Sequence, residues 1–440
     1  MSKNIDRNKI ETLKNILKGL HRGEPLEELK RRFKDVLEGL SPFEIPLVEQ
    51  ELVREGVPIP EILRLCDLHV ELLRDVLRSD ELKGVPSGHP LNLLSDENKI
   101  IARLAEALNI YAEALSKASL GEAASYLKAI SDIVAELRKF RLHYRKIQML
   151  IFPYLERRGI TAVPRVLWGR EDQAIVKIRE LRDLVEKSLA NLDNLGGYIK
   201  NIAEKSAELS RELSDLIFRE ERILFPAVWA LFSEGEWAAI HEAAKYIGYL
   251  VPSDVEWTPK AKPLLPYEIS GVVTQDQIEK LPQEFKFAAL ATLTPDIYKI
   301  KSEGDLELGT GFLNKDDIEA IFKRLPIEIT YADFNDRVKF FSESIFGRGF
   351  ARTKTIIGRK IEYCHPPRLE GFIKSNIDEL KSGRSDYKVY WTKLGDRTIR
   401  VLIVAIKDEN GRYLGTLEIV EDLTEILNNP DDVKRRIIVL

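Results

Sequence analysis

Apolar residues recur every three or four positions in four long stretches between residues 84 and 250, which is the spacing of amphipathic helices. The stretches cover residues 90–116, 122–157, 164–192 and 198–232. Their lengths are typical of an up-and-down four-helix bundle, a fold that builds ligand and metal sites from side chains facing its core. The first stretch follows SGHP, so Pro90 can occupy the first helical position, where its missing N–H costs nothing. We therefore expect His89 at the mouth of the bundle.

Residues 1–83 also show helical periodicity, interrupted by GLSPFEIP and GVPIPE, and predict a separate all-helical module. Cys66 and His69 lie one turn apart on its apolar face. One Cys and one His are too few ligands for a metal site, and both residue types are common in protein cores. We interpret the pair as core residues.

A different pattern begins after the bundle region, which we place at residues 84–250. Prolines at positions 252, 259, 263 and 266 stop the helices and predict a linker over residues 251–310. From 311 to 430 the period changes to two residues, as in strands. The expected strands lie at 329–333, 338–343, 387–394, 398–408 and 413–423, and the expected helices at 315–324 and 367–381. An antiparallel sheet with helices on one face is α+β, so the fold class is multidomain, α plus α+β.

The composition argues against several kinds of partner. Lys and Arg total 67 against 71 Asp and Glu, and no basic block could follow a phosphate backbone, so we expect no nucleic-acid partner. No apolar run of about 18 residues and no signal core occur, so we expect no membrane anchor. Two cysteines favour a reducing, cytoplasmic compartment. The high Glu, Lys and Arg content fits a thermophile.

The bundle region contains an internal near-repeat. Residues 146–153 are KIQMLIFP and residues 219–226 are REERILFP, so superposing the Phe-Pro pairs places Gln148 opposite Glu221. We expect each Phe-Pro pair to close a helix at corresponding depth, with the preceding polar residue facing inward. Gln148 would be a poor metal ligand, because a neutral amide oxygen does not compensate for dehydration of the ion.

Four segments, in order, resemble the motifs of the hemerythrin-like HHE domain: GHPLNLLSDEN (88–98), HYRKIQMLIFPYLERRGI (143–160), PRVLWGRED (164–172) and IFREERILFPAVWALFSEGEW (217–237). The resemblance implies an iron or zinc site. The residues at the family's ligand positions are His89, His143, Glu171 or Asp172, and Glu221 with Glu220 beside it.

Two of the family's ligand positions are altered, since Asn92 replaces a histidine and Gln148 replaces a carboxylate. Two imidazoles and two or three carboxylates still suffice for one iron or zinc ion, or for a weakly held pair. The alternative is a vestigial set without metal, in which Glu171 and Glu221 pair with neighbouring arginines: Arg170, Arg145 or Arg219. A buried carboxylate cluster needs a counter-charge in either case.

The C-terminal region resembles a PAS domain of the type that follows hemerythrin-like domains. The resemblance rests on residues 311–343, 353–383 and 411–426, and its most distinctive piece is CHPP after an IGRK turn. It implies a pocket for haem, flavin or a small metabolite, or else a dimerisation module, and it places Cys364 and His365 at or near the pocket. The N-terminal module resembles the helical domain of unknown function that precedes hemerythrin-like domains.

We interpret the chain as a cytosolic sensory or regulatory protein rather than an enzyme, with its output through a partner signalling protein. This follows because only NNPDDVKRRIIVL comes after the PAS-like segment, and neither a phosphate-binding glycine motif nor a nucleophile elbow is present. Two alternatives stay open: a non-haem iron protein that handles oxygen or redox signals, and an interaction scaffold without cofactor. Residues 398–423 are almost continuously apolar, which predicts a covered outer sheet face and hence a homo-oligomer.

Overall fold

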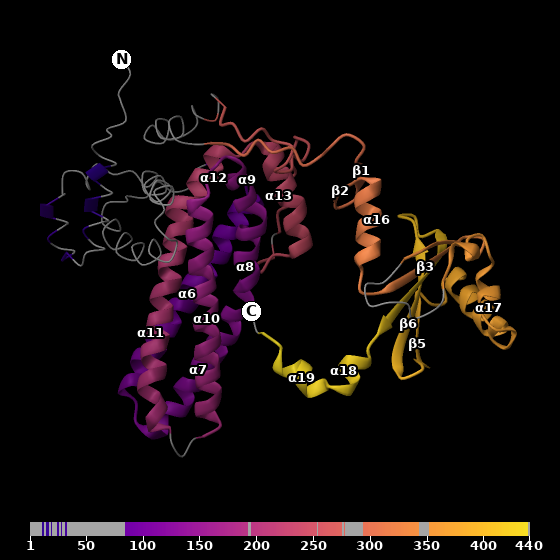
Figure 1. Cartoon of the computed structure of the whole chain (residues 1–440). Coiled ribbons are helices and arrows are strands. Elements are labelled where there is room, and N and C mark those ends of the chain that lie inside the picture. The colour runs from indigo at the N-terminus through magenta and orange to yellow at the C-terminus, as the bar shows by residue number, and fades with distance from the viewer. Residues whose placement is uncertain are drawn as a thin grey trace. The chain divides into compact units, whose positions relative to one another are not determined.

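The structure, a computed structural model, describes residues 84–191, 195–252, 254–274, 277, 294–342 and 352–438, together with a few positions between 11 and 32. The chain divides into two compact units, Met1–Lys299 and Ile300–Leu440 (Figure 1). Cys66, His69 and most of the predicted N-terminal module lie outside the described residues.

The predicted four-helix bundle is confirmed, and its four rods run side by side in Figure 1. The first rod is α6 (Pro90–Lys117) and the third is α10 (Ala162–Leu189). The second rod consists of five successive segments: α7 (Leu120–Leu137), η1 (Arg138–Phe140), α8 (Arg141–Lys146), η2 (Ile147–Ile151) and α9 (Phe152–Arg157). The fourth consists of α11 (Gly196–Arg219), η4 (Glu220–Leu224) and α12 (Phe225–Leu231). As expected, His89 caps α6 and Pro90 follows it.

The near-repeat produces the same local structure twice, since η2 and η4 are both single π-helical turns directly before a Phe-Pro pair. Proline causes this, because it lacks an N–H and its ring collides with the carbonyl four residues earlier. A wider turn relieves both problems, and π-helical turns of this kind are frequent at functional sites. The residues in these turns therefore do not follow the angular spacing of an α-helix.

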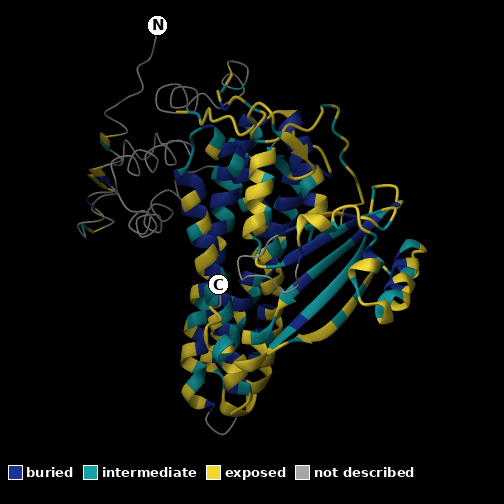
Figure 2. Cartoon of the chain, turned by 45° about the vertical axis from the view of Figure 1, so that its right-hand side comes forward, coloured by how far each residue is buried: buried dark blue, intermediate teal, exposed yellow. Residues whose placement is uncertain are grey.

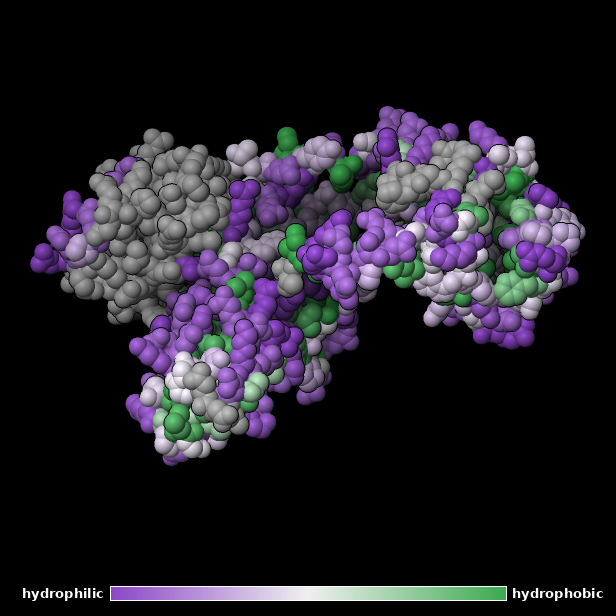
Figure 3. Space-filling view, turned by 60° about the horizontal axis from the view of Figure 1, so that its bottom comes forward, coloured by the Kyte–Doolittle hydropathy of each residue, from purple (hydrophilic) through white to green (hydrophobic). Residues whose placement is uncertain are grey.

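A fifth helix, α13 (Glu234–Ile247), follows the bundle and was not predicted from the sequence. It begins at a capping box in which Ser233 and Glu236 satisfy each other's backbone N–H groups. The core of the unit has two buried clusters, one along the middle of the bundle and one around the Phe-Pro ends. On the face seen in Figure 3, hydrophilic residues cover most of the bundle's surface.

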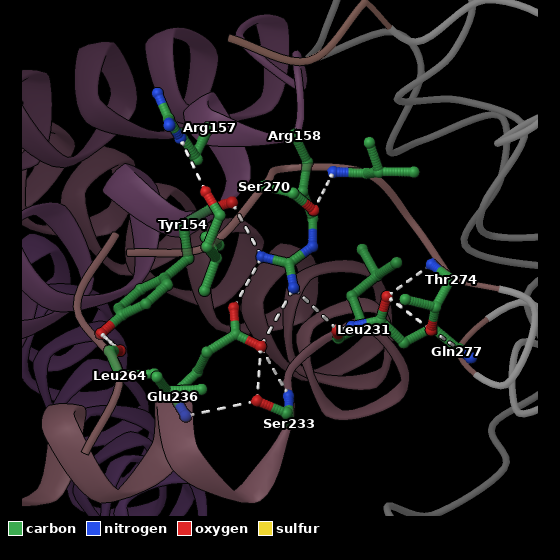
Figure 4. A network of polar contacts seen from close by, with 12 residues as sticks. Tyr154, Arg157, Arg158, Leu231, Ser233, Glu236, Leu264, Ser270, Thr274 and Gln277 are labelled. Atoms are coloured by element: carbon green, nitrogen blue, oxygen red, sulfur yellow. Dashed lines mark hydrogen bonds and ion pairs between the residues drawn. The ribbon is translucent and has the colours of Figure 1, made fainter. Parts of the chain in front are cut away.

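The chain after α13 lies against the Phe-Pro end of the bundle. Within residues 254–274, which we call the crossing segment, the carbonyl of Leu264 accepts a bond from the Tyr154 hydroxyl at 2.8 Å. The carbonyl of Ile269 accepts one from Arg157 Nε at 3.2 Å. Beside these contacts, the buried guanidinium of Arg158 is 2.8 Å from Glu236, and the whole network is visible in Figure 4. The prolines therefore prevent helix formation without detaching the segment from the bundle.

The second unit contains a five-stranded antiparallel sheet in the order β4-β3-β7-β6-β5. All five predicted strands are confirmed: β3 (Glu328–Asp333), β4 (Val338–Phe341), β5 (Tyr387–Leu394), β6 (Arg397–Lys407) and β7 (Tyr413–Asp422). The predicted helices are also present as α16 (Lys315–Arg324) and α17 (Pro367–Lys381). A small hairpin of β1 (Leu306–Leu308) and β2 (Gly311–Leu313) and two short helices, α18 (Thr424–Asn428) and α19 (Pro430–Arg435), were not predicted.

The register divides the sheet into two faces. On the inner face, Ala332 and Val338 pack with buried residues of α17, including Ile373 and Ile377. Residues paired across the strands share a face, so Tyr387, Val404 and Leu417 lie together on the outer one. The outer face is half-buried in β6 and β7 and exposed at β5, where Tyr387, Val389 and Trp391 are large exposed apolar residues (Figure 2).

Candidate functional site

A network of buried charged side chains lies in the bundle core, and each of the four rods contributes to it. Its members are Glu97 of α6, His143 and Lys146 of α8, Glu171 of α10 and Glu220 of η4. Each of these residues is at most 1% exposed. Burial without compensation would make such a cluster strongly unfavourable, so the contacts among these groups decide their charges.

His143 is the centre of the network. Its Nδ1 is 2.8 Å from Glu97 Oε2, and its Nε2 is 2.9 Å from Glu220 Oε2. Burial alone would lower the pKa of the imidazole, but the two carboxylates outweigh it and raise the pKa to about 9. His143 is therefore an imidazolium at neutral pH, with both ring nitrogens acting as donors.

Lys146 supplies the second positive charge, one helical turn from His143. Its Nζ donates to Glu97 Oε1 at 2.7 Å and to the carbonyl of Gly248 at 3.0 Å. Burial lowers the pKa of the ammonium, while the charge of Glu97 opposes this effect. Glu97 also accepts a bond from the backbone N–H of Leu250 at 2.9 Å. The network is thus bonded directly to the chain that leaves α13.

Glu171 differs from the other carboxylates because no cation contacts it among the described residues. Gln148 Nε2 donates to its Oε2 at 2.6 Å. Burial, reinforced by the charge of Glu220, raises the pKa of Glu171 to about 8. Oε1 of Glu171 and Oε1 of Glu220 are buried without a hydrogen-bond partner. A proton on Glu171 at neutral pH lowers the repulsion between these two carboxyl groups.

Two of the predicted site residues lie away from the centre of this network. Glu221 is half-buried and accepts a bond from Asn98 Nδ2 at 3.1 Å, and burial raises the pKa of its carboxyl. The neighbouring Glu220, rather than Glu221, contacts His143. Both residues lie in a π-helical turn, where α-helical spacing does not show which side chain faces inward.

His89 lies among aromatic rings, apart from the contacts of His143. Its ring meets Trp229, Trp237 and Trp257 edge-on, with centroids 4.5–5.2 Å apart. Its Nδ1 accepts the backbone N–H of Leu91 at 3.2 Å, which caps α6. Burial and the nearby His241 lower the pKa of His89 to about 4, so the ring is neutral at pH 7. The structure does not bring His89 into contact with His143, Glu171 or Glu221.

The arrangement of these side chains does not fit a bound metal ion. Both ring nitrogens of His143 face carboxylates, so neither has a free lone pair, and Lys146 occupies an oxygen of Glu97. Across the described ranges, no group of three His, Cys, Asp or Glu side chains could hold a metal ion. Glu171 and Glu221 accept hydrogen bonds from Gln148 and Asn98, and their pairing with arginines stays a prediction.

Sequence reasoning missed Glu97 and Lys146, and mentioned Glu220 only as the neighbour of Glu221. A signal for Lys146 exists, because it is three residues after His143 and therefore lies on the same helix face. Glu97 lies two turns beyond His89 within the first motif, in the first third of the first predicted helix. Its contact with a residue 46 positions away could not be inferred from local spacing.

In the second unit, Cys364 is the last residue of η6 (Ile361–Cys364), and His365 follows it directly. The Cys364 side chain is exposed, and His365 Nδ1 contacts the backbone carbonyl of Ile361 at 3.0 Å. Polar groups lie on the inner sheet face, where buried Arg352 pairs with Glu328 and with Glu418. A cofactor role for Cys364 and His365 stays a prediction.

Comparison with known families divides the chain as the motifs do. Residues 13–79 match a family of unknown function (DUF438), and residues 318–424 match the PAS domain model. Residues 89–228 match the hemerythrin HHE cation binding domain. The chain therefore combines a DUF438 segment, a hemerythrin-type bundle and a PAS domain, as the sequence resemblance predicted.

Three similar solved structures each cover about a quarter of the chain. The C-terminal domain of a Streptococcus mutans protein is 27% identical, with 28% of this chain and 96% of that one covered and a TM-score of 0.27. A PAS domain from Colwellia psychrerythraea is 18% identical, with coverage of 25% and 97% and a TM-score of 0.20. A sensory box sensor histidine kinase from Vibrio cholerae is 13% identical, with coverage of 24% and 88% and a TM-score of 0.19. A comparison with curated proteins gave no match. None of the helices in the described part of the chain is long and apolar enough to span a membrane.

Proposed function

We propose that this chain is a sensory protein of the cytoplasm, in which the hemerythrin-type bundle detects a chemical change and the PAS domain passes it to a partner protein. The pairing of these two domains in one chain supports the proposal. The observation that carries it is the bonding of Lys146 and Glu97 to Gly248 and Leu250, because these backbone groups begin the chain that leads out of the bundle.

This bonding gives a physical route for a signal. A change in charge within the network alters the bonds of Lys146 and Glu97, and with them the position of the chain after α13. The crossing segment, fixed by Tyr154 and Arg157, then receives the change before it reaches the PAS unit. Such coupling requires two arrangements of the chain after α13. The charge network at one end and the PAS unit at the other must each differ in free energy between these arrangements.

Self-association through the outer sheet face is part of the proposal. Tyr387, Val389 and Trp391 are exposed side by side along β5, continuous with half-buried apolar residues of β6 and β7. A contiguous exposed apolar surface of this kind is typical of protein interfaces. In a homo-oligomer two PAS domains would lie together, and a change in their packing would alter the surface that a partner protein binds.

Hydrogen exchange measured by mass spectrometry tests the sensory role. His143→Gln removes a charge from the network, while Lys139→Gln removes one from an exposed position of the same rod. We expect His143→Gln to change amide protection around residues 248–274 and also in the PAS unit, and Lys139→Gln to change neither. Changes confined to the bundle helices would contradict the proposal.

A further inference from the structure

The buried network already contains the positive charge that its carboxylates require. Glu97 contacts both His143 and Lys146, and Glu220 contacts His143, at distances of 2.7–2.9 Å. Each cation is enclosed, since His143 is 0% and Lys146 is 1% exposed. Two carboxyl side chains are thus in direct contact with two side-chain cations, and buried charges require such pairing in a low-dielectric interior.

Among the residues that the structure describes, the contacts that explain the burial of Lys146 come from this network and from the chain directly after α13. Its Nζ lies 4.9 Å from the centre of the Tyr249 ring, in addition to its bonds to Glu97 and Gly248. A buried lysine carries a large desolvation cost, which a surface position would avoid. The position is therefore explained by the charge of Glu97 and by the backbone that Lys146 holds.

We propose that the ammonium of Lys146 takes the place of the cation for which the HHE domain is named, so that this bundle is complete without a metal ion. The same group bonds Gly248, so the built-in cation also fastens the start of the chain that leaves the bundle. A metal ion that binds Glu97 Oε1 must displace Lys146, and it would break this attachment.

Metal analysis and thermal unfolding of the full chain test the proposal first. The protein is produced with added iron and zinc and purified without chelator, and its metal content and Tm are measured with and without EDTA. We expect no stoichiometric iron or zinc, and the same Tm in both conditions, because a ligand stabilises only a state that it binds. Stoichiometric metal, or a Tm lowered by EDTA, would overturn the proposal.

Variants at Lys146 test the built-in cation directly. Lys146→Gln should lower the Tm strongly, because it leaves Glu97 with a single counter-charge, whereas Lys139→Gln at an exposed position should not. Adding Glu97→Gln to Lys146→Gln should restore part of the lost Tm, since the unbalanced carboxylate is then gone. A double variant less stable than Lys146→Gln alone would contradict the charge-balancing role. If Lys146→Gln fails to fold, metal content and the EDTA response of the parent chain still decide the question.

This inference concerns the bundle alone and is independent of the sensory role. Metal content does not depend on whether the PAS unit responds, and the exchange experiment does not depend on what supplies the positive charge. A metal-free bundle with no response in the PAS unit would leave the inference intact and remove the proposed function. Stoichiometric metal together with a response in the PAS unit would remove the inference and leave the proposed function intact.

Discussion

At the scale of single residues, the side chains that contact His143 define the centre of the bundle. Glu97 and Glu220 hold it as an imidazolium, Lys146 completes the balance, and Glu171 keeps a proton. Two substitutions relative to the family pattern, Asn92 and Gln148, are consistent with a site that does not depend on metal. The charges of these groups lead to two predictions.

Stability should fall as the pH rises from neutral to alkaline. His143 has a pKa of about 9 in the fold against an ordinary value of 6.5, so its contribution is complete below pH 6.5 and lost as the pH approaches 9. Glu171, with a pKa of about 8 against 4.5, binds more protons when folded, so its effect has the same sign and ends by pH 8. We expect a loss on the order of 3 kcal/mol from His143, measured by urea unfolding across this range.

The variant His143→Gln separates the two contributions. It should remove the contribution of His143 from the total decline and keep that of Glu171, whose pKa rises further because the charge of His143 lowers it in the parent. Lys139→Gln, an exposed change in the same rod, should leave the whole profile as in the parent. A total decline as large as that of the parent in His143→Gln would show that His143 is not charged in the fold.

Restoring a carboxylate at position 148 should destabilise the bundle. In the structure Gln148 donates its amide to Glu171, so Gln148→Glu replaces a hydrogen bond by two facing carboxyl groups. We expect a cost on the order of 3 kcal/mol in chelator-treated protein. Met149→Glu adds the same charge one residue along, where the side chain is 48% exposed, and should cost much less. Equal losses would mean that position 148 does not face Glu171.

At the scale of elements, proline decides two features that are easily misread. The proline of each Phe-Pro pair forces a π-helical turn in the residues before the pair. In the fourth rod this turn brings Glu220 to His143. In the crossing segment proline prevents helix formation, yet the extended chain is still held against the bundle. Gly271 lies in this attached segment. Its φ of +71° is one that other residues rarely adopt.

Gly271→Ala should loosen the crossing segment. A Cβ at this position would lie 2.2 Å from the carbonyl oxygen of Arg157, so backbone must move in addition to the strain of a positive φ. Gly84→Ala is a matched control, with φ +85° but nothing within 4 Å of the new Cβ, and should cost only about 1 kcal/mol. Limited proteolysis should cut Gly271→Ala within residues 254–274 faster than the control. Equal rates would contradict the close packing seen in the structure.

At the scale of the whole molecule, two compact units are joined in one chain. The bundle buries a small network of charged groups and is mostly hydrophilic on the face seen in Figure 3, whereas the sheet has exposed apolar residues on its outer face at β5. A sheet with one uncovered apolar face is expected to find a partner surface. The quaternary state is therefore the property to measure at this scale.

Trp391→Lys should reduce the molar mass measured by light scattering from that of an oligomer to that of a monomer. The side chain is 56% exposed on the outer face, and an ammonium there would be buried in the proposed interface. Tyr246→Lys, at a 95% exposed position of α13, should leave the mass unchanged. A monomeric parent chain from which proteolysis releases a stable, soluble PAS unit would contradict self-association.

Hydrophobic periodicity by itself determined the four rods of the bundle and the five strands of the sheet. This succeeds because periods of 3.6 and two residues follow from local backbone geometry, and each element here is long enough to show its period. It did not reveal α13, which begins at a capping box, or the hairpin of β1 and β2, whose strands of three residues each are too short to show a period.

Only the tertiary structure decided the composition of the charge network. The family motifs pointed to His143, Glu171 and the Glu220–Glu221 pair, but Glu97 meets His143 across 46 residues and Glu220 meets it across 77. Such contacts depend on which faces of packed helices meet and on the two π-helical turns, not on spacing within one segment. For the same reason His89 belongs to a tryptophan cluster and Lys146 to the centre of the site.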